Sequence, residues 1–169
     1  MVQPQLNLSE DIQVSREGKY LTFALANEEY GIAILKVREI IGMMPITFIP
    51  QTPHFVKGVI NLRGKVIPVV DLRLKFGMPE QEYTERTSII VVEILGETGQ
   101  KIHISIVVDR VSEVVNIKGD EIEDTPTFGT RVNTEFILGM AKISGGVKIL
   151  LDIQKVLDRE EISMIEQTV

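Results

Sequence analysis

The sequence predicts an all-β protein made of two duplicated five-stranded units, and three observations support this fold class. Short β-rich segments are separated by turns that contain Gly or Pro, as in GVINLRGKVIPVVDL at 58–72. The same order of segments occurs twice along the chain. Helical spacing of apolar residues is confined mainly to the C-terminal end. This punctuation is typical of barrels or a sandwich, and five strands are enough for a small barrel.

In the first unit, strands are expected at 20–25, at 58–62 and at 65–71, with a block of apolar residues at 32–41. The turn between the last two strands contains Arg63 and Gly64, which predicts a hairpin. A phosphate-binding loop is excluded because the spacing before Gly64-Lys65 is one residue too long and β-branched residues follow in place of a helix. Pro68 predicts an edge or bulge position, since proline lacks a backbone donor.

Short helices are expected after the last strand of each unit. Asp71 is placed to cap a helical turn at 72–76, and Asp152 is placed to cap its counterpart. The second unit opens with a strand at 87–95. Apolar residues near helical spacing predict a C-terminal helix within 152–167.

The two units align with constant offsets. The hairpin at 58–72 matches GMAKISGGVKILLDI at 139–153 with an offset of 81 residues, and 32–41 matches 106–115 with an offset of 74. The repeats span about 20–76 and 87–157, within a domain predicted at 18–169. The chain is expected to cross between the halves, because the ends of a duplicated unit often pack on its mate.

Composition narrows the function. The chain has 169 residues, a net charge of −6, no Trp and no Cys. The acidity argues against nucleic-acid binding and binding to anionic membranes, and the lack of Cys excludes disulfides and thiolate chemistry. No apolar run approaches the roughly 18 residues of a membrane span. Without a signal-like N-terminus, the sequence predicts a cytoplasmic protein with a flexible tail at 1–17.

Catalytic motifs are sparse. His54 and His103 have no ligand-like neighbours, so surface or satisfied histidines are the preferred interpretation. Ser144 precedes two glycines in a predicted turn and is better explained by turn chemistry. The sequence therefore predicts no enzyme, no metal site and no cofactor. What remains is Arg63 at a hairpin tip, where its repeat-mate is Ser144, so the fold does not require arginine there.

Three segments carry a resemblance to a known family: EEYGIAILKVREI, TPHFVKGVINLRGKVIPVVDLRLKF and IVVDRVSEV. Over about residues 18–166 the sequence resembles the CheW family of bacterial chemotaxis coupling proteins, whose domain also occurs in the kinase CheA. The resemblance implies two intertwined five-stranded SH3-like barrels with a shared interior and a C-terminal helix. It implies a non-enzymatic adaptor that links the regulatory domain of the histidine kinase CheA to the cytoplasmic tip of methyl-accepting chemoreceptors. Such a protein is recruited to membrane-associated receptor arrays without inserting into the membrane.

The resemblance also assigns partner-binding positions by motif. These are Val37, Glu39, Gly58, Arg63, Ser105, Val111 and Val114. Family members often have Gly where Ser105 and Arg110 stand, and the loop at 95–101 is longer than in the family. Arg63 and Glu39 are expected either to form a partly buried ion pair or to leave Arg63 free for a partner carboxylate. The alternative function is a small β-barrel nucleic-acid-binding module, against which the acidity and the lack of an aromatic platform argue.

Overall fold

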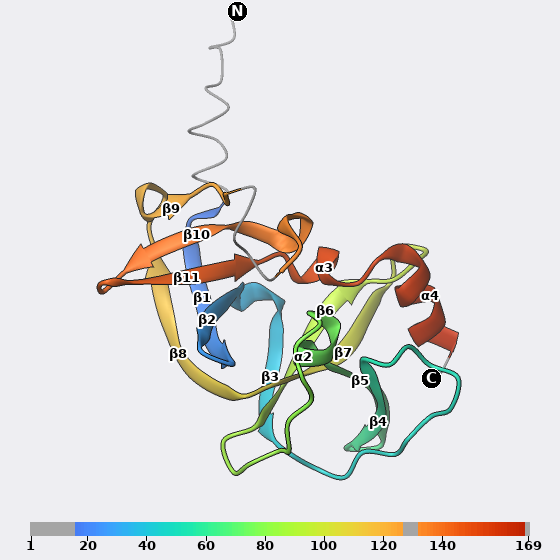
Figure 1. Ribbon diagram of the computed structural model, residues 1–169. Coiled ribbons are helices and arrows are strands. Elements are labelled where there is room, and N and C mark those ends of the chain that lie inside the picture. Colours follow the sequence, from blue (N-terminus) through green and yellow to red (C-terminus); the bar gives the residue numbers. More distant parts are fainter. Residues whose placement is uncertain (1–15, 127–131, 168–169) are drawn as a thin grey trace, which may run out of the picture.

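A computed structural model describes residues 16–126 and 132–167, and the eleven strands in this part of the chain form two sheets that pack side by side (Figure 1). The strands are β1 Gly18–Leu25, β2 Glu28–Ala33, β3 Val37–Gly42, β4 Val56–Leu62, β5 Lys65–Asp71, β6 Ser88–Leu95, β7 Lys101–Val108, β8 Arg110–Ile117, β9 Ile122–Glu123, β10 Ile137–Ile143 and β11 Gly146–Leu151. Short 3-10 turns occupy Ile34–Lys36, Gly119–Glu121 and Thr134–Phe136.

The two sheets exchange strands between the sequence halves. One sheet has the order β8-β1-β2-β11-β10-β9, and the other has the order β3-β6-β7-β5-β4. The six-stranded sheet contains β1 and β2 of the first half and β8 to β11 of the second half. The five-stranded sheet contains β6 and β7 of the second half and β3 to β5 of the first half. In the five-stranded sheet an isolated bridge between Thr47 and Val59 takes the place that β9 has in its mate. The predicted intertwined, duplicated β-fold is confirmed.

Two parallel strand pairs join the halves. In one sheet β11 pairs with β2 from Lys148 opposite Glu29 onwards, and in the other β5 pairs with β7 from Val69 opposite Ser105 onwards. The remaining strand pairs in the described part are antiparallel. The parallel pairs use equivalent strands, so the sheets are related by the same repeat that the sequence contains.

One large apolar core is shared by both sheets. Phe23 and Tyr30 from the six-stranded sheet contact the same buried cluster as Ile90 and Ile104 from the five-stranded sheet. A smaller cluster of Ile, Val and Met side chains lies within the five-stranded sheet, and a third lies within the six-stranded sheet. Because the largest cluster draws on both sheets, burial of its apolar surface stabilises their association as well as each sheet alone.

Both hairpins that end the sequence units close with the same turn. Arg63 and Gly64 have φ angles of 52° and 85°, and Ser144 and Gly145 have 51° and 76°. Positive φ at both central residues is the type I′ geometry, whose twist matches that of the flanking strands. The turn therefore holds its first residue, Arg63 or Ser144, at the tip of a well-ordered hairpin.

Short helices follow both hairpins as predicted. They are α2 Leu72–Lys75, capped by Asp71, and α3 Ile153–Val156, capped by Asp152. The C-terminal helix predicted within 152–167 is confirmed as α4 Arg159–Gln167, which begins after Asp158 and is separate from α3. Asp158 and Glu161 form a reciprocal capping box, in which each side chain accepts from the other residue's backbone N–H.

The tail expected at 1–17 lies outside the described residues up to residue 15. Arg16 already belongs to the fold, since its side chain is largely buried and Nη1 donates to Asp124 Oδ1 and to the carbonyl of Leu138, each at 3.0 Å. Of the helices in the described part, none has the length and apolar character needed to cross a membrane.

Candidate protein-interaction site

Arg63 and Glu39 bridge the two ends of the five-stranded sheet. Glu39 lies on β3 at one end of the strand order, and Arg63 lies in the β4–β5 turn at the other. Arg63 Nη1 donates to Glu39 Oε1 at 2.8 Å, and Nη2 donates to Oε2 at 2.6 Å. This paired geometry uses the planar fork of the guanidinium fully, which fixes both side chains. The sheet is thereby bridged across its opening by one ion pair.

The pair is exposed, which corrects the expectation of a partly buried one. The Arg63 side chain is 70% exposed, while that of Glu39 is more covered. Hydrogen bonding to Arg63 lowers the pKa of the Glu39 carboxyl below its usual value, and the same bonds raise the pKa of Arg63. Exposed ion pairs contribute little to stability. The pair therefore organises an accessible surface more than it stabilises the fold.

The matching hairpin has no such bridge. Ser144 occupies the position of Arg63, and Glu113 occupies that of Glu39 on β8. Within the described residues Glu113 forms no ion pair, and its backbone bonds instead to the hydroxyl of Thr22. Since the β10–β11 hairpin and its six-stranded sheet form without such a pair, the fold does not require an arginine at the β4–β5 turn.

A row of charges continues from this pair across the same sheet. Arg38 Nη2 donates to Glu93 Oε2 at 2.5 Å, and His103 Nε2 lies 3.3 Å from Glu93 Oε1. The hydrogen bond from Arg38 is the main reason that the pKa of Glu93 lies below its usual value. A shallow hollow of about 340 Å³ connects this row with Arg63 and Glu39. Cations and anions thus alternate over the strands, with each acid already paired.

Val37 and Val111 lie where the chain crosses from one sheet to the other. β2 ends at Ala33 in the six-stranded sheet and β3 begins at Val37 in the five-stranded one, while β7 and β8 make the reverse crossing. Both valines are half-buried and pack against the shared core. They are repeat-mates, so the two crossings present equivalent apolar residues at the junction of the barrels.

Val114 and its repeat-mate Ile40 are exposed apolar residues on the two edge strands that follow these crossings. Val114 is 51% exposed and Ile40 is 45% exposed. The sequence-based assignment included Val114 but missed Ile40, although the offset of 74 residues aligns the two. The edge strands β3 and β8 therefore each offer one apolar side chain to solvent beside a half-buried valine.

Gly58 and Ser105 lie inside the fold. Gly58 has φ +139°, and a Cβ atom there would lie 2.0 Å from the carbonyl oxygen of Thr47. This glycine lets the 43–55 loop pass directly over the hairpin, where Thr47 pairs with Val59. Ser105 is fully buried on β7, and its Oγ has no hydrogen-bond partner in the described part of the chain. Neither residue presents a side chain to the surface.

Asp109 anchors the second crossing, and the sequence pattern did not predict this role. Asp109 accepts from Arg73 Nε at 2.7 Å and Nη2 at 2.9 Å, and from the backbone N–H of Ala26 at 2.8 Å. Arg73 and Ala26 both belong to the first half, so this carboxylate ties the crossing in the second half to the first half. Asp109 lies within the IVVDRVSEV segment that carries the family resemblance, and this was the sequence feature that could have pointed to it. Arg110 beside it is held by Glu29 Oε1 at 2.7 Å.

The residues considered for catalysis do not gather. His54 Nε2 lies 3.3 Å from the carbonyl of Leu74, whereas His103 is next to Glu93, and Ser144 is in the β10–β11 turn. The described residues contain no group of three or more His, Asp or Glu side chains arranged for a metal ion. The chemistry that the described part does organise is the Glu39–Arg63 pair, the charge row and the apolar positions at the crossings.

These features define a double-barrel protein of the adaptor class, in which an ordered surface is available for binding other proteins. The chain belongs to the CheW family, because the CheW-like domain matches residues 19–161. A chemotaxis protein CheW from Klebsiella aerogenes is 42% identical over 148 residues, which cover 88% of this chain and 86% of that protein. The Bacillus subtilis chemotaxis protein CheW is 32% identical, with 84% and 88% covered.

A solved structure agrees with this assignment. The crystal structure of the scaffolding protein TtCheW from Thermoanaerobacter tengcongensis has a TM-score of 0.76 and 39% sequence identity, and the match covers 86% of this chain and 95% of that one. The fold is therefore the SH3-like double barrel that the resemblance implied. At the level of the family, the chain is a chemotaxis coupling adaptor, and these relatives give no support to a nucleic-acid-binding module.

Proposed function

We propose that this protein joins the regulatory domain of the histidine kinase CheA to the cytoplasmic tips of methyl-accepting chemoreceptors, and that it does so without catalysis. The observation that carries the proposal is the exposed Glu39–Arg63 pair. It holds the β4–β5 hairpin against β3, yet the equivalent hairpin forms without it. A preorganised, accessible guanidinium is suited to a partner carboxylate or to a strand docked beside it.

We infer that the apolar positions at the crossings bind the receptor tip. Val37 and Val111 are half-buried at the junction of the barrels, and Val114 and Ile40 are exposed on the edge strands that follow. A helical partner commonly places its apolar face in such a groove. Gly58 and Ser105 would then act from inside, by setting the path of the 43–55 loop and the packing of β7.

The location follows from this role. The adaptor would work in the cytoplasm and join receptor arrays at the membrane through its protein partners. Two findings support recruitment over insertion: the described part contains no helix that could cross a membrane, and the chain carries a net charge of −6, which disfavours anionic lipid surfaces.

The test is an amide chemical-shift titration of labelled protein with the CheA regulatory domain and, separately, with a receptor-tip fragment. We expect two distinct sets of shifted amides, one of which includes the β4–β5 turn or β3. Arg63→Ala should weaken assembly of the three-protein complex by about tenfold or more while leaving the spectrum that of a folded protein. Ser144→Ala is the matched control at the other hairpin. If neither partner shifts any amide, or if Arg63→Ala assembles as well as the control, the proposal fails.

A further inference from the structure

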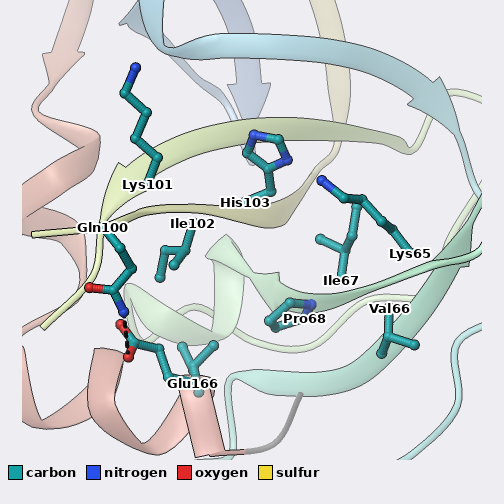
Figure 2. Close-up of a pocket in the computed structure, with 10 residues that line it drawn as sticks. Lys65, Val66, Ile67, Pro68, Gln100, Lys101, Ile102, His103 and Glu166 are labelled. Carbon is teal, nitrogen blue, oxygen red and sulfur yellow. Dashed lines mark hydrogen bonds between the residues drawn. The ribbon is translucent and has the colours of Figure 1, made fainter. Parts of the chain in front are cut away.

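A second surface lies between β5 and β7, beside the C-terminal helix. Here the two strands diverge and enclose a cleft of about 380 Å³. We call it the β5–β7 cleft. It is lined by Lys65, Val66, Ile67 and Pro68 of β5, by Gln100, Lys101, Ile102 and His103 at the start of β7, and by Ile165 and Glu166 of α4. Figure 2 shows these three elements facing one another around the opening.

The repeat reveals why the cleft exists. In the other sheet the equivalent strands β11 and β2 are already paired at Lys148, whereas β5 and β7 pair only from Val69. By the offset of 81, Lys148 corresponds to Ile67, so two pairs are missing. Pro68 stands where the paired strand has Ile149, and proline has no N–H to donate to a ladder. The β4 side of β5 remains paired through Pro68.

This divergence leaves strand edges open within a sheet. Residues 101–104 of β7 are paired with β6 on one side but have no partner strand on the side that faces β5. The same holds for 65–68 of β5, whose other side is paired with β4. Unpaired edges of this kind are templates for an added strand. An extended peptide rises roughly 3.3 Å per residue, so a short segment would fill the opening.

The lining specifies the side chains of such a peptide. The apolar side chains that reach the cleft surface are Val66, which is 50% exposed, and the half-buried Ile102, whereas Ile67, Pro68 and Ile165 line it but are buried. Lys65 and Lys101 supply cations; Figure 2 shows Lys65 reaching towards His103 and Lys101 extending outwards. In the described part neither lysine forms an ion pair, although Lys101 exerts a weaker, longer-range attraction on Glu93.

The acids around the cleft already accept hydrogen bonds from neighbouring residues. Glu166 accepts hydrogen bonds from Gln100 at 3.2 Å and from the backbone N–H of Glu97 at 2.9 Å. Glu93 is held by Arg38 and His103. Hydrogen bonds from neutral donors leave the charge of Glu166 in place, so Lys65 and Lys101 against Glu166 give the lining a small positive excess, on a chain whose net charge is −6. This local reversal of sign favours a negatively charged occupant.

We propose that the β5–β7 cleft binds an extended segment of a partner protein in which carboxylate side chains alternate with apolar ones, and that the segment pairs as a strand with the open edge of β7. Main-chain hydrogen bonds would hold the segment in register. Its apolar side chains would enter the cleft, and its carboxylates would meet Lys65 and Lys101. The proposal does not depend on which protein binds at the Glu39–Arg63 pair.

The experiment titrates labelled full-length protein with an acetylated, amidated hexapeptide of alternating glutamate and valine. We expect saturable amide shifts at Lys65, Val66 and Ile67 and over 101–104. A peptide with lysine in place of glutamate should bind at least about tenfold more weakly. The glutamate–valine peptide methylated on every backbone nitrogen should lose binding, because it has no N–H to pair.

Two further experiments distinguish a peptide site in the cleft from a general effect of charge and from binding of a single carboxylate. The double variant Lys65→Glu/Lys101→Glu should bind the acidic peptide at least about tenfold more weakly, whereas Lys19→Glu/Lys155→Glu makes the same charge change away from the cleft and should bind normally. Free glutamate should give no saturable shift. Absence of shifts in the cleft, equal binding of the lysine or methylated peptide, saturation by glutamate alone, or equal effects of the two double variants would each overturn the proposal.

Discussion

The β4–β5 and β10–β11 hairpins share a backbone design but differ in the side chains they present. Both close with a type I′ turn, both contain a register shift at a glycine, and both expose a valine near the turn, Val66 at 50% and Val147 at 51%. The turn and the register shift are set by backbone conformation, so both copies of the hairpin must keep them.

The differences lie at positions that the backbone leaves open. Arg63 is replaced by Ser144 in the second hairpin, Pro68 by Ile149, and Lys75 of the following helix by Val156. In the first unit these residues provide an exposed ion pair, an open strand edge and a buried anchor for α4. Arg63 and Pro68 therefore distinguish the surface of one unit on a backbone that both units share, whereas Lys75 stabilises a helix contact that the other unit lacks.

The largest effect is expected where the fold requires glycine. Gly58→Ala places a Cβ atom 2.0 Å from the Thr47 carbonyl oxygen at a φ of +139°, so the loop must move. We expect a loss of about 4 kcal/mol or more in the free energy of unfolding. Chemical denaturation followed by circular dichroism measures it.

Gly145→Ala separates strain from collision in that experiment. Gly145 also has a positive φ, +76°, but a Cβ atom there would meet nothing within 4 Å. Its loss should be about 1 kcal/mol. Equal losses in the two variants would show that the path of the 43–55 loop does not depend on Gly58.

The second largest effect concerns the anchor of α4. Lys75 Nζ donates to both carboxylate oxygens of Glu161, at 2.8 and 2.7 Å, and lies 4.7 Å from the centre of the Phe55 ring. Both side chains are largely buried, with 11% and 16% exposed. Glu161→Gln keeps the capping geometry but leaves the ammonium unpaired, which should destabilise the protein by about 3 kcal/mol.

Glu160→Gln is the control for this change, because Glu160 is an exposed neighbour on the same helix without an ion pair in the described part. Thermal unfolding of both variants makes the comparison. If they unfold at the same temperature, the Lys75–Glu161 pair does not anchor α4, and the helix is held by the burial of Ile162 and Ile165 and by the hydrogen bonds of Glu166.

The sequence predicted the topology well because the repeat is a long-range signal. Offsets of 74 and 81 residues identify equivalent strands, and a duplicated unit implies that the halves exchange partners. The turn at Arg63 and the caps at Asp71 and Asp152 were predictable for a different reason, because each is decided by the chemistry of a few neighbouring residues. The start of α4 after Asp158 could also have been predicted, because Asp158 and Glu161 have the spacing of a capping box. The helical spacing of apolar residues on both sides of Asp158 drew attention away from this boundary.

The site was harder to predict because it depends on distances through space. That Glu39 and Arg63 meet follows from the curl of the sheet, and their exposure depends on what packs around them. The anchoring role of Asp109 requires α2 of the other half, which no local pattern reveals. The open β7 edge could be inferred only by comparing strand pairing between the two sheets, although Pro68 was a hint.

Exchanging Arg63 and Ser144 tests directly whether the turn residue affects partner binding without affecting the fold. We expect Arg63→Ser to leave the melting temperature within roughly 2 °C of the parent protein, since the pair is exposed, and to weaken kinase or receptor binding. Ser144→Arg should be equally stable but should not restore binding in the Arg63→Ser background, because its surroundings differ. Calorimetry and a pull-down give the two readouts. Restored binding would place the function in the hairpin tip alone.

The smallest effect is on the protonation of Glu39. In the parent protein its pKa lies below the usual 4.5 because Arg63 donates two hydrogen bonds to the ionised carboxylate. Removing these donors in Arg63→Ser should raise the pKa towards 4.5. A lowered folded-state pKa means that the stability from this pair is complete above 4.5 and is lost as pH falls through the folded-state value.

A carbon-detected titration of the side-chain carboxyls in both proteins measures this shift. Glu80, whose pKa is lowered by Lys57, serves as an internal control and should titrate identically in the two. Added salt should narrow the difference at Glu39, because a solvent-exposed pair is screened. An unchanged Glu39 titration would mean that the two side chains do not stay paired in solution. Arg63 would then be a free guanidinium, and the first hairpin would differ from the second only in what it offers to a partner.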